Sequence, residues 1–203
     1  MIELAKKNNS ILHLMGLLSD GGVHSHERHL WALLQHAAQQ GVKDVVIHSL
    51  LDGRDTPQKS ALTYIKRLQT KISEINQNFP NTDIRFGMVS GRFWAMDRDK
   101  RWDRVEKAYN TLIDVENSEL IIDNNPCEAI ETAYAKGETD EFVFPRVIKS
   151  NKRVRVSDND SFLFFNFRSD RAREISEAIA IPGFTGFKRL RTINSVSYTH
   201  LQN

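Results

Sequence analysis

Apolar and polar positions follow two alternating patterns from the start of the chain. Residues 11–18 form an apolar run, typical of a buried strand, which stops at the turn residues Asp20-Gly21-Gly22. After this turn, apolar side chains recur every three or four positions between Leu30 and Ala38, and Gly41 follows them. This spacing predicts a helix with one buried face that ends near the glycine.

The same order of strand, polar turn and helix recurs along the chain. Further strands are predicted over residues 45–51, 84–89 and 161–167, the second of them interrupted by Gly87. Helical faces are predicted from four sets of residues: Ile65, Leu68, Ile72 and Ile75; Trp102, Val105, Tyr109 and Leu112; Ile130, Ala133 and Tyr134 after Pro126; and Ala172, Ile175 and Ile179 in a helix that opens at Asp170. We expect residues 140–160 to be irregular or to hold an edge strand, and residues 191–198 to supply a further strand.

Strands that alternate with helices predict an α/β fold, a three-layer α/β/α sandwich around a mostly parallel or mixed sheet. The chain has 203 residues, of which 40% are hydrophobic, and this is enough to bury one sizeable core. No internal segment has the composition of a linker. We therefore expect residues 1–203 to form a single domain.

Charge and composition argue against several classes of protein. The 28 Lys and Arg residues nearly balance the 26 Asp and Glu residues, and a net charge of +2 provides no global attraction to nucleic acid or an anionic membrane. No apolar run approaches the ~20 residues that a membrane span needs, and the first residues lack the apolar core of a signal peptide. The single cysteine, Cys127, excludes an internal disulfide and suits a reducing compartment. We expect a monomeric cytoplasmic protein that binds neither nucleic acid nor membrane.

Charged side chains gather in the segments that follow the predicted strands. Because the carboxyl ends of parallel strands lie at one edge of a sheet, these segments are expected to line a common crevice. They contain Asp20, His24 and His26; Asp52, Arg54 and Asp55; Arg92, Asp97 and Arg98; and Arg168, Asp170 and Arg171. Solvated loops also carry charges, but four such loops at one edge indicate a binding site.

Arginine is the informative residue type because its guanidinium group donates paired hydrogen bonds to a carboxylate or a phosphate. In the segment NFRSDRAR, Arg168 ends a predicted strand and Arg171 lies in the first turn of a predicted helix. Both can reach an anion beside the free amide groups of that helix. The alternative is two surface ion pairs, Arg168 with Asp170 and Arg171 with Glu174.

Three histidines, His24, His26 and His29, lie within six positions. A His-x-His pattern can bind zinc or manganese, which leaves a histidine-based metallohydrolase as an alternative. Arginines in the neighbouring loops would oppose a divalent cation, so a contact between one imidazole and the substrate is favoured. The residues alone thus predict an α/β domain whose crevice binds a small phosphate- or carboxylate-bearing molecule.

Four segments, GLLSDGGVHSH, LDGRDTP, GRFWAMDRDKRW and NFRSDRAR, occur in this order. Together they resemble the substrate-binding (phosphotransferase) domain of the cofactor-independent, 2,3-bisphosphoglycerate-independent phosphoglycerate mutases. The resemblance covers residues from about 11 to 200. It implies an enzyme that interconverts 3-phosphoglycerate and 2-phosphoglycerate.

The resemblance also implies which residues contact the substrate. By matching motif, these are His24, Arg54, Asp55, Arg92, Arg98, Arg168 and Arg171. In this reading Arg168 and Arg171 cradle the phosphate, whereas Arg92 and Arg98 hold the carboxylate or share the task. Asp55 would accept a proton from the glycerate hydroxyl that attacks phosphoserine.

In the resembled family, the nucleophilic serine and two divalent metal ions, typically manganese, lie in an alkaline-phosphatase-like domain. That domain has no counterpart in this sequence, so we expect no metal site in this chain. We expect the chain alone to bind phosphoglycerate weakly and not to turn it over. The non-enzymatic alternative is a stand-alone small-anion binding module.

Overall fold

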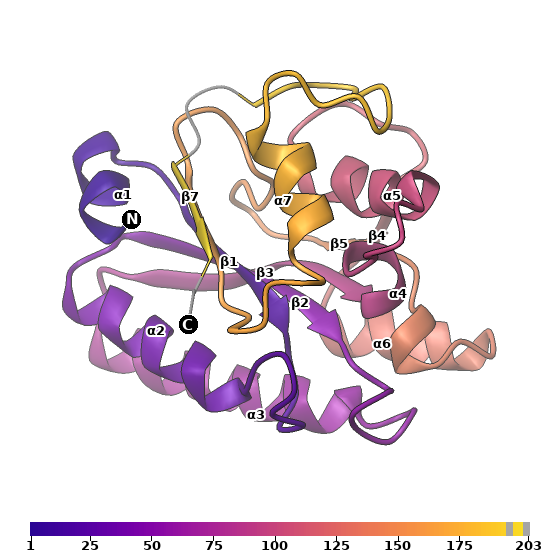
Figure 1. Cartoon of the computed structure of the whole chain (residues 1–203). Helices are drawn as coiled ribbons and strands as arrows, with labels where there is room; N and C mark the ends of the chain where they lie inside the picture. Colours follow the sequence, from indigo (N-terminus) through magenta and orange to yellow (C-terminus); the bar gives the residue numbers. More distant parts are fainter. Residues whose placement is uncertain (194–196, 201–203) are drawn as a thin grey trace.

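The fold is a mixed β-sheet covered by helices on both faces (Figure 1). The structure is a computed structural model, which describes residues 1–193 and 197–200. Across the sheet the strands follow the order β4-β5-β3-β2-β1-β6-β7. They are β1 (Leu12–Leu17), β2 (Asp44–Leu51), β3 (Asp83–Gly91), β4 (Ile121–Asp123), β5 (Arg146–Ile148), β6 (Ser161–Phe164) and β7 (Ser197–His200). Paired strands run parallel, except that β5 is antiparallel to β3.

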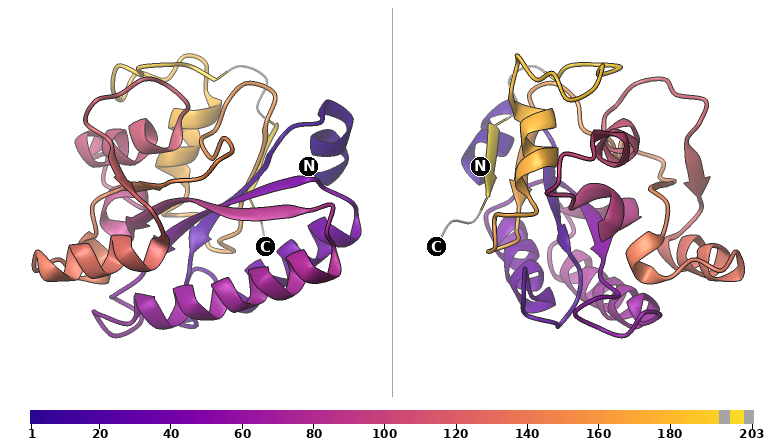
Figure 2. Two further views of the ribbon diagram at one scale, coloured as in Figure 1. Left: turned by 180° about the vertical axis from the view of Figure 1, so that it is seen from behind. Right: turned by 45° about the vertical axis from the view of Figure 1, so that its right-hand side comes forward.

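Two hydrophobic clusters fill the space between the sheet and the helices on its two faces. One cluster joins the sheet to α2, α3 and α6 through residues such as Leu34, Ile65 and Ile130, and the other joins it to α5 and α7. Both helical layers are visible in Figure 2. The helices are α1 (Ile2–Asn8), α2 (Glu27–Gln39), α3 (Ala61–Asn78), α4 (Arg92–Ala95), α5 (Trp102–Leu112), α6 (Pro126–Ala135), α7 (Arg173–Ala180) and the 3-10 helix η1 (Asp140–Phe142).

The predicted sandwich and its mixed sheet are confirmed. The segment 140–160 is largely irregular and holds β5, the strand next to the edge strand β4. β7 lies in the tail, where a further strand is predicted. Residues 194–196 of that predicted segment lie outside the described part. The hydrophobic pattern does not predict α1, α4 or β4, which span only seven, four and three residues. None of the helices in the described residues has both the length and the apolar character that a membrane span requires.

Two predicted boundaries, the end of β6 and the start of α7, are wrong. β6 ends at Phe164 instead of residue 167, because the side-chain Oδ1 of Asn166 takes the place of a strand carbonyl and accepts the amide of Leu17 at 2.9 Å. α7 begins at Arg173 rather than Asp170, because the Asp170 carboxylate binds arginine side chains and does not cap the helix. Arg171 therefore lies before the first turn of this helix.

Gly87 is required by close packing inside the sheet. The pairing of β2 with β3 shifts register there, so that Ile47 pairs with Phe86 and His48 with Met88. A Cβ atom on Gly87 would lie 2.5 Å from the Val46 side chain and 2.7 Å from the carbonyl oxygen of Val154. The interruption seen in the sequence is thus a β-bulge that only glycine fits.

Candidate functional site

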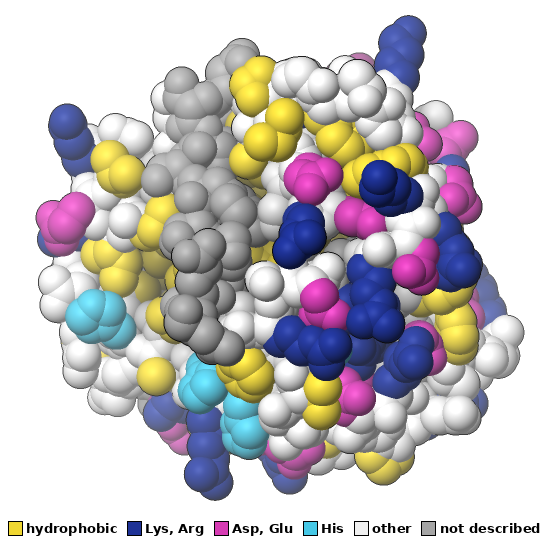
Figure 3. Space-filling model, in the orientation of Figure 1, with side chains coloured by type: hydrophobic (Ala, Val, Ile, Leu, Met, Phe, Trp, Pro, Cys, Tyr) yellow, Lys and Arg dark blue, Asp and Glu magenta, His cyan; other side chains and the backbone are white. Residues whose placement is uncertain are grey.

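The predicted site residues lie in loops that meet at the carboxyl edge of the sheet. The strands that lead into these loops, β3, β2, β1 and β6, are neighbours in the sheet, which brings the loops together. Lys and Arg side chains, interspersed with Asp and Glu, gather on this face between α4 and α7 (Figure 3).

Arg92 is the most deeply buried of the predicted arginines, with 4% of its surface exposed. Its Nη1 donates to Asp52 Oδ1 at 2.8 Å and to Asp55 Oδ2 at 2.7 Å. Its Nη2 lies 2.9 Å from His24 Nε2. Arg92, which directly follows β3, thus links two predicted site residues, His24 from the loop after β1 and Asp55 from the loop after β2, and also binds Asp52.

His24 is neutral in this environment. Burial and the neighbouring Arg92 lower the pKa of its imidazole to about 4, and the charge of Asp170 opposes this shift only in part. Because a guanidinium can only donate, Nε2 of His24 is the acceptor and Nδ1 carries the hydrogen. Nδ1 lies 3.8 Å from Asp170 Oδ1, on the side of the β6–α7 loop.

Asp170 brings Arg98 and Arg168 together. Its Oδ2 accepts from Arg98 Nη1 at 3.0 Å and from Arg168 Nη2 at 2.9 Å, and its Oδ1 lies 2.9 Å from Arg168 Nε. Burial raises the pKa of Asp170, but the hydrogen bonds from the two arginines outweigh burial and lower it. The alternative pairing of Arg168 with Asp170 is therefore present, with the Arg168 side chain 46% exposed, and Asp170 binds Arg98 as well.

Arg171 lies close to the same group of charged side chains. Its Nη1 donates to the carbonyl of Met96 at 3.0 Å, whereas Glu174, its alternative partner from the sequence, accepts from the amide of Lys100. Burial lowers the pKa of Arg171, and the charges of Arg98, Arg92 and Arg54 lower it further. These arginines, distant in the sequence, are therefore close enough to repel one another.

A small cavity of about 80 Å³ opens among these side chains. Arg54, Arg92 and Arg171 line it together with Arg101 and Arg104, which the sequence analysis did not select. The signal was present in the segment MDRDKRWDR, but arginines at the start of a predicted helix look like solvated surface residues. Asp52, noted earlier only as a charged loop residue, is buried and bonded to Arg92.

The histidines do not form a metal cage. His24 is engaged by Arg92, and His26 Nδ1 accepts the amide of Arg28 at 3.2 Å and so caps α2. Within residues 1–193 and 197–200, no three His, Cys, Asp or Glu side chains gather in a group that could hold a metal ion. The described residues of this chain therefore do not fit a pair of divalent ions.

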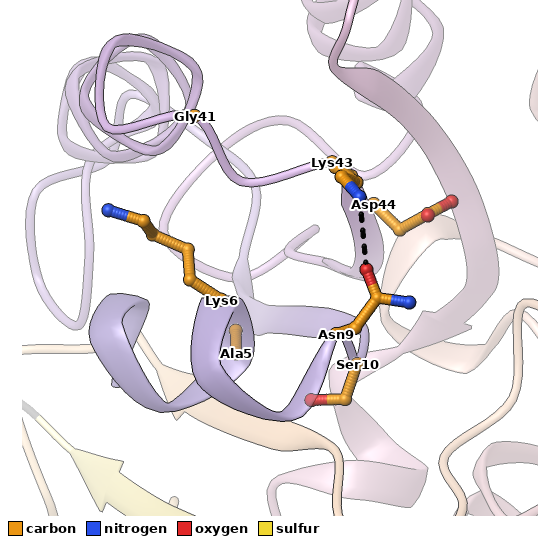
Figure 4. Close-up of a pocket in the computed structure, with 7 residues that line it drawn as sticks. All are labelled: Ala5, Lys6, Asn9, Ser10, Gly41, Lys43 and Asp44. Atoms are coloured by element: carbon orange, nitrogen blue, oxygen red, sulfur yellow. Dashed lines mark hydrogen bonds between the residues drawn. The ribbon is translucent and has the colours of Figure 1, made fainter.

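A second hollow, of about 240 Å³, differs from the crevice in its chemistry (Figure 4). It lies where α1 and α2 end, and its two lysines, Lys6 and Lys43, point away from one another. Lys43 Nζ donates to Asn9 Oδ1 at 3.3 Å. Cations near the carboxyl ends of helices offset the helix dipole, which accounts for these lysines without a ligand.

Comparisons with known proteins agree with the resemblance seen in the motifs. The chain is 50% identical over 200 residues to the 2,3-bisphosphoglycerate-independent phosphoglycerate mutase of Clostridium novyi (strain NT). It is 47% identical over 201 residues to the mutase of the same name from Francisella tularensis subsp. tularensis (strain FSC 198). These alignments cover 98% of this chain but only 37% and 38% of the relatives.

A solved structure shows the same fold. The phosphoglycerate mutase of Leishmania mexicana, determined at low cobalt concentration, superposes with a TM-score of 0.91 and 30% sequence identity. The superposition covers 98% of this chain and 37% of that one. At the level of families, all residues from 1 to 203 match the description "BPG-independent PGAM N-terminus (iPGM_N)", and the chain belongs to this family.

Proposed function

We propose that this chain forms the substrate-binding part of a 2,3-bisphosphoglycerate-independent phosphoglycerate mutase and holds the glycerate group during phosphoryl transfer. The observation that carries the proposal is the convergence of Arg54, Arg92, Arg98 and Arg171 on one crevice, where the first three depress the pKa of the fourth. An anion with a carboxylate and a phosphate relieves this repulsion, because its phosphate alone carries about −1.5 to −2 charges at neutral pH.

The geometry suggests a division of tasks among the residues. Arg54, Arg98 and Arg168 have exposed side chains, and together with Arg171 they would bind phosphate or carboxylate. Asp55, whose side chain is 23% exposed beside Arg92, would accept the proton from a glycerate hydroxyl. His24, with a hydrogen on Nδ1, would donate to the substrate.

The rest of the reaction would take place on chain outside the sequence printed here. The relatives are more than twice as long, and in the resembled family a serine in a phosphatase-like domain takes the phosphoryl group and returns it to the other hydroxyl. Two divalent ions, manganese in our proposal, would supply charge stabilisation in that domain. Glycerate that stays bound in the crevice makes the return step effectively intramolecular. We further propose that the whole protein is a cytoplasmic monomer.

Side-chain NMR of the arginines tests the proposed function. Upon addition of 3-phosphoglycerate, we expect the Nε–H signals of Arg54, Arg92, Arg98, Arg168 and Arg171 to shift. The signals of Arg155 and Arg189, which bind carbonyls at the far ends of α5 and α7, should stay in place. If inorganic phosphate alone produces the same shifts at the same concentration, the chain is a general anion-binding module. If no signal moves, the proposal is wrong.

A further inference from the structure

Asp52 is the point where three loops of the crevice are joined. It directly follows β2, has 2% of its surface exposed, and has both carboxylate oxygens occupied by donors from the protein itself. Its Oδ1 accepts from the backbone amides of Arg54 at 3.2 Å and Asp55 at 3.0 Å and from Arg92 Nη1 at 2.8 Å. Its Oδ2 accepts from the hydroxyl of Ser19, in the loop after β1, at 2.8 Å.

These contacts keep the Asp52 carboxylate ionised. Burial raises its pKa, but the hydrogen bonds from the Asp55 amide, Ser19 and Arg92 outweigh burial and lower it. Two carboxylates, Asp52 and Asp55, thus share one guanidinium nitrogen of Arg92. The second carboxylate is unexpected in a crevice that binds an anion, because each negative charge repels the ligand. The hydrogen bonds by which Asp52 orders the surrounding loops offer an explanation for this carboxylate.

We infer that Asp52 is a positioning residue, which orients Arg92 and the Arg54–Asp55 backbone so that His24 and Asp55 face the substrate. This inference rests on the proposed function. Arg92 engages His24 through Nη2, while its other terminal nitrogen, Nη1, is held by Asp52 together with Asp55. Asp52 thereby sets the tautomer of His24 without touching it.

The substitutions Asp52→Ala and Asp52→Asn separate positioning from charge, because both remove the charge but only asparagine keeps an acceptor oxygen. If Asp52 acted only through its charge, both substitutions would tighten the binding of 3-phosphoglycerate. If Asp52 positions Arg92, Asp52→Ala should weaken binding, by about tenfold when measured by calorimetry, and Asp52→Asn should weaken it less. An affinity of Asp52→Ala that is unchanged or tighter would overturn the inference.

The imidazole of His24 gives a second readout that needs no ligand. The groups that act on it are Arg92, Asp170, Arg168 and Asp55. NMR titration of the wild-type chain should show the pKa of His24 at about 4 and a hydrogen on Nδ1. In Asp52→Ala, Arg92 loses one of its two carboxylate partners, and its displacement from His24 should move this pKa upward by at least one unit, toward its ordinary value of about 6.5.

Two further variants guard against a general loss of structure. Asp123→Asn removes a buried carboxylate that pairs with Arg146 in β5, away from the crevice, and should leave the pKa of His24 at about 4. Ser19→Ala removes one bond to Asp52 but keeps the charge of Asp52, and should shift the pKa of His24 in the same direction by less than Asp52→Ala does. A His24 pKa that stays near 4 in both Asp52→Ala and Ser19→Ala contradicts the inference. If wild-type chain fails to bind 3-phosphoglycerate, the proposed function fails, while the titration of His24 still decides the role of Asp52.

Discussion

At the scale of single residues, a buried chain of hydrogen bonds lies far from the crevice, near the amino end of β1. Asp160 accepts from His13 Nε2 at 3.1 Å, and His13 Nδ1 lies 2.9 Å from His48 Nε2. Arg153 Nη2 and the amides of Ile11 and Ser157 also donate to Asp160. Burial lowers the pKa of both histidines, so both are neutral in the folded protein.

This network makes the stability of the fold depend on pH. The two histidines have folded-state pKa values below the unfolded value of about 6.5, so acidification below that pH protonates the unfolded chain preferentially and favours unfolding. The pKa of Asp160 is also depressed, because hydrogen bonds from Arg153 and His13 outweigh its burial. Its contribution is complete above the unfolded pKa of about 4 and is lost as the pH falls further.

We predict that His48→Gln reduces the slope of unfolding free energy against pH between 6.5 and 5. One buried neutral histidine contributes up to about 1.4 kcal/mol per pH unit in this window. Urea denaturation at several pH values measures the slope. His36→Gln, at an exposed position on α2, is the matched control and should keep the wild-type slope. Equal slopes in wild type and His48→Gln would contradict the role of this histidine.

At the scale of elements, distant side chains complete the ends of several helices. The cap residue of α3, Ser60, makes no capping bond with its own side chain. Instead, Asp140 in η1 accepts from the amides of Ser60 and Ala61 at 2.9 Å each. Asp140 also accepts from the hydroxyl of Tyr134, and burial raises its pKa. Arg155 binds the carbonyls of Asn110, Thr111 and Val115 at the end of α5.

We predict that Asp140→Ala destabilises the fold through α3. Loss of an N-terminal cap costs about 1–2 kcal/mol, and two amides are left without their acceptor. Asp140→Asn retains an acceptor oxygen and should lose less. Denaturant unfolding of the two variants, compared with wild type, provides the measurement. Equal stability of Asp140→Ala and wild type would show that η1 does not support α3.

The different roles of the arginines show what could and could not be predicted from the sequence. Hydrophobic periodicity predicted the main strands and helices, and the order of these elements placed the charged loops at one edge. It could not separate arginines of the crevice from arginines such as Arg155, which bind backbone carbonyls. The fully buried Arg146 of β5, beside Asp123 and Glu138, gives no sign of its burial in the sequence. Partners that lie far apart along the chain decide these roles.

At the scale of the whole molecule, sheet order determines the site. Because β3, β2, β1 and β6 are adjacent, loops from both ends of the chain meet above one edge. The loop after β3 is held against the rest by close contact with η1. A Cβ atom on Gly91 would lie 2.2 Å from the carbonyl oxygen of Glu141, and the Trp94 Nε1 donates to the carbonyl of Phe142 at 3.1 Å. The backbone that carries Arg92 is therefore fixed by its packing against η1.

Calorimetric titration with 3-phosphoglycerate most directly tests whether this arginine cluster binds the substrate. Arg171→Gln removes the guanidinium that lies close to the charges of Arg98, Arg92 and Arg54. The control, Lys7→Gln, removes one positive charge from the exposed surface of α1, away from the crevice. A charge-assisted hydrogen bond contributes about 1.5–3 kcal/mol, so Arg171→Gln should weaken binding by roughly ten- to a hundredfold. Lys7→Gln should bind like wild type. Equal affinities for all three proteins would show that the phosphoglycerate does not bind at these arginines.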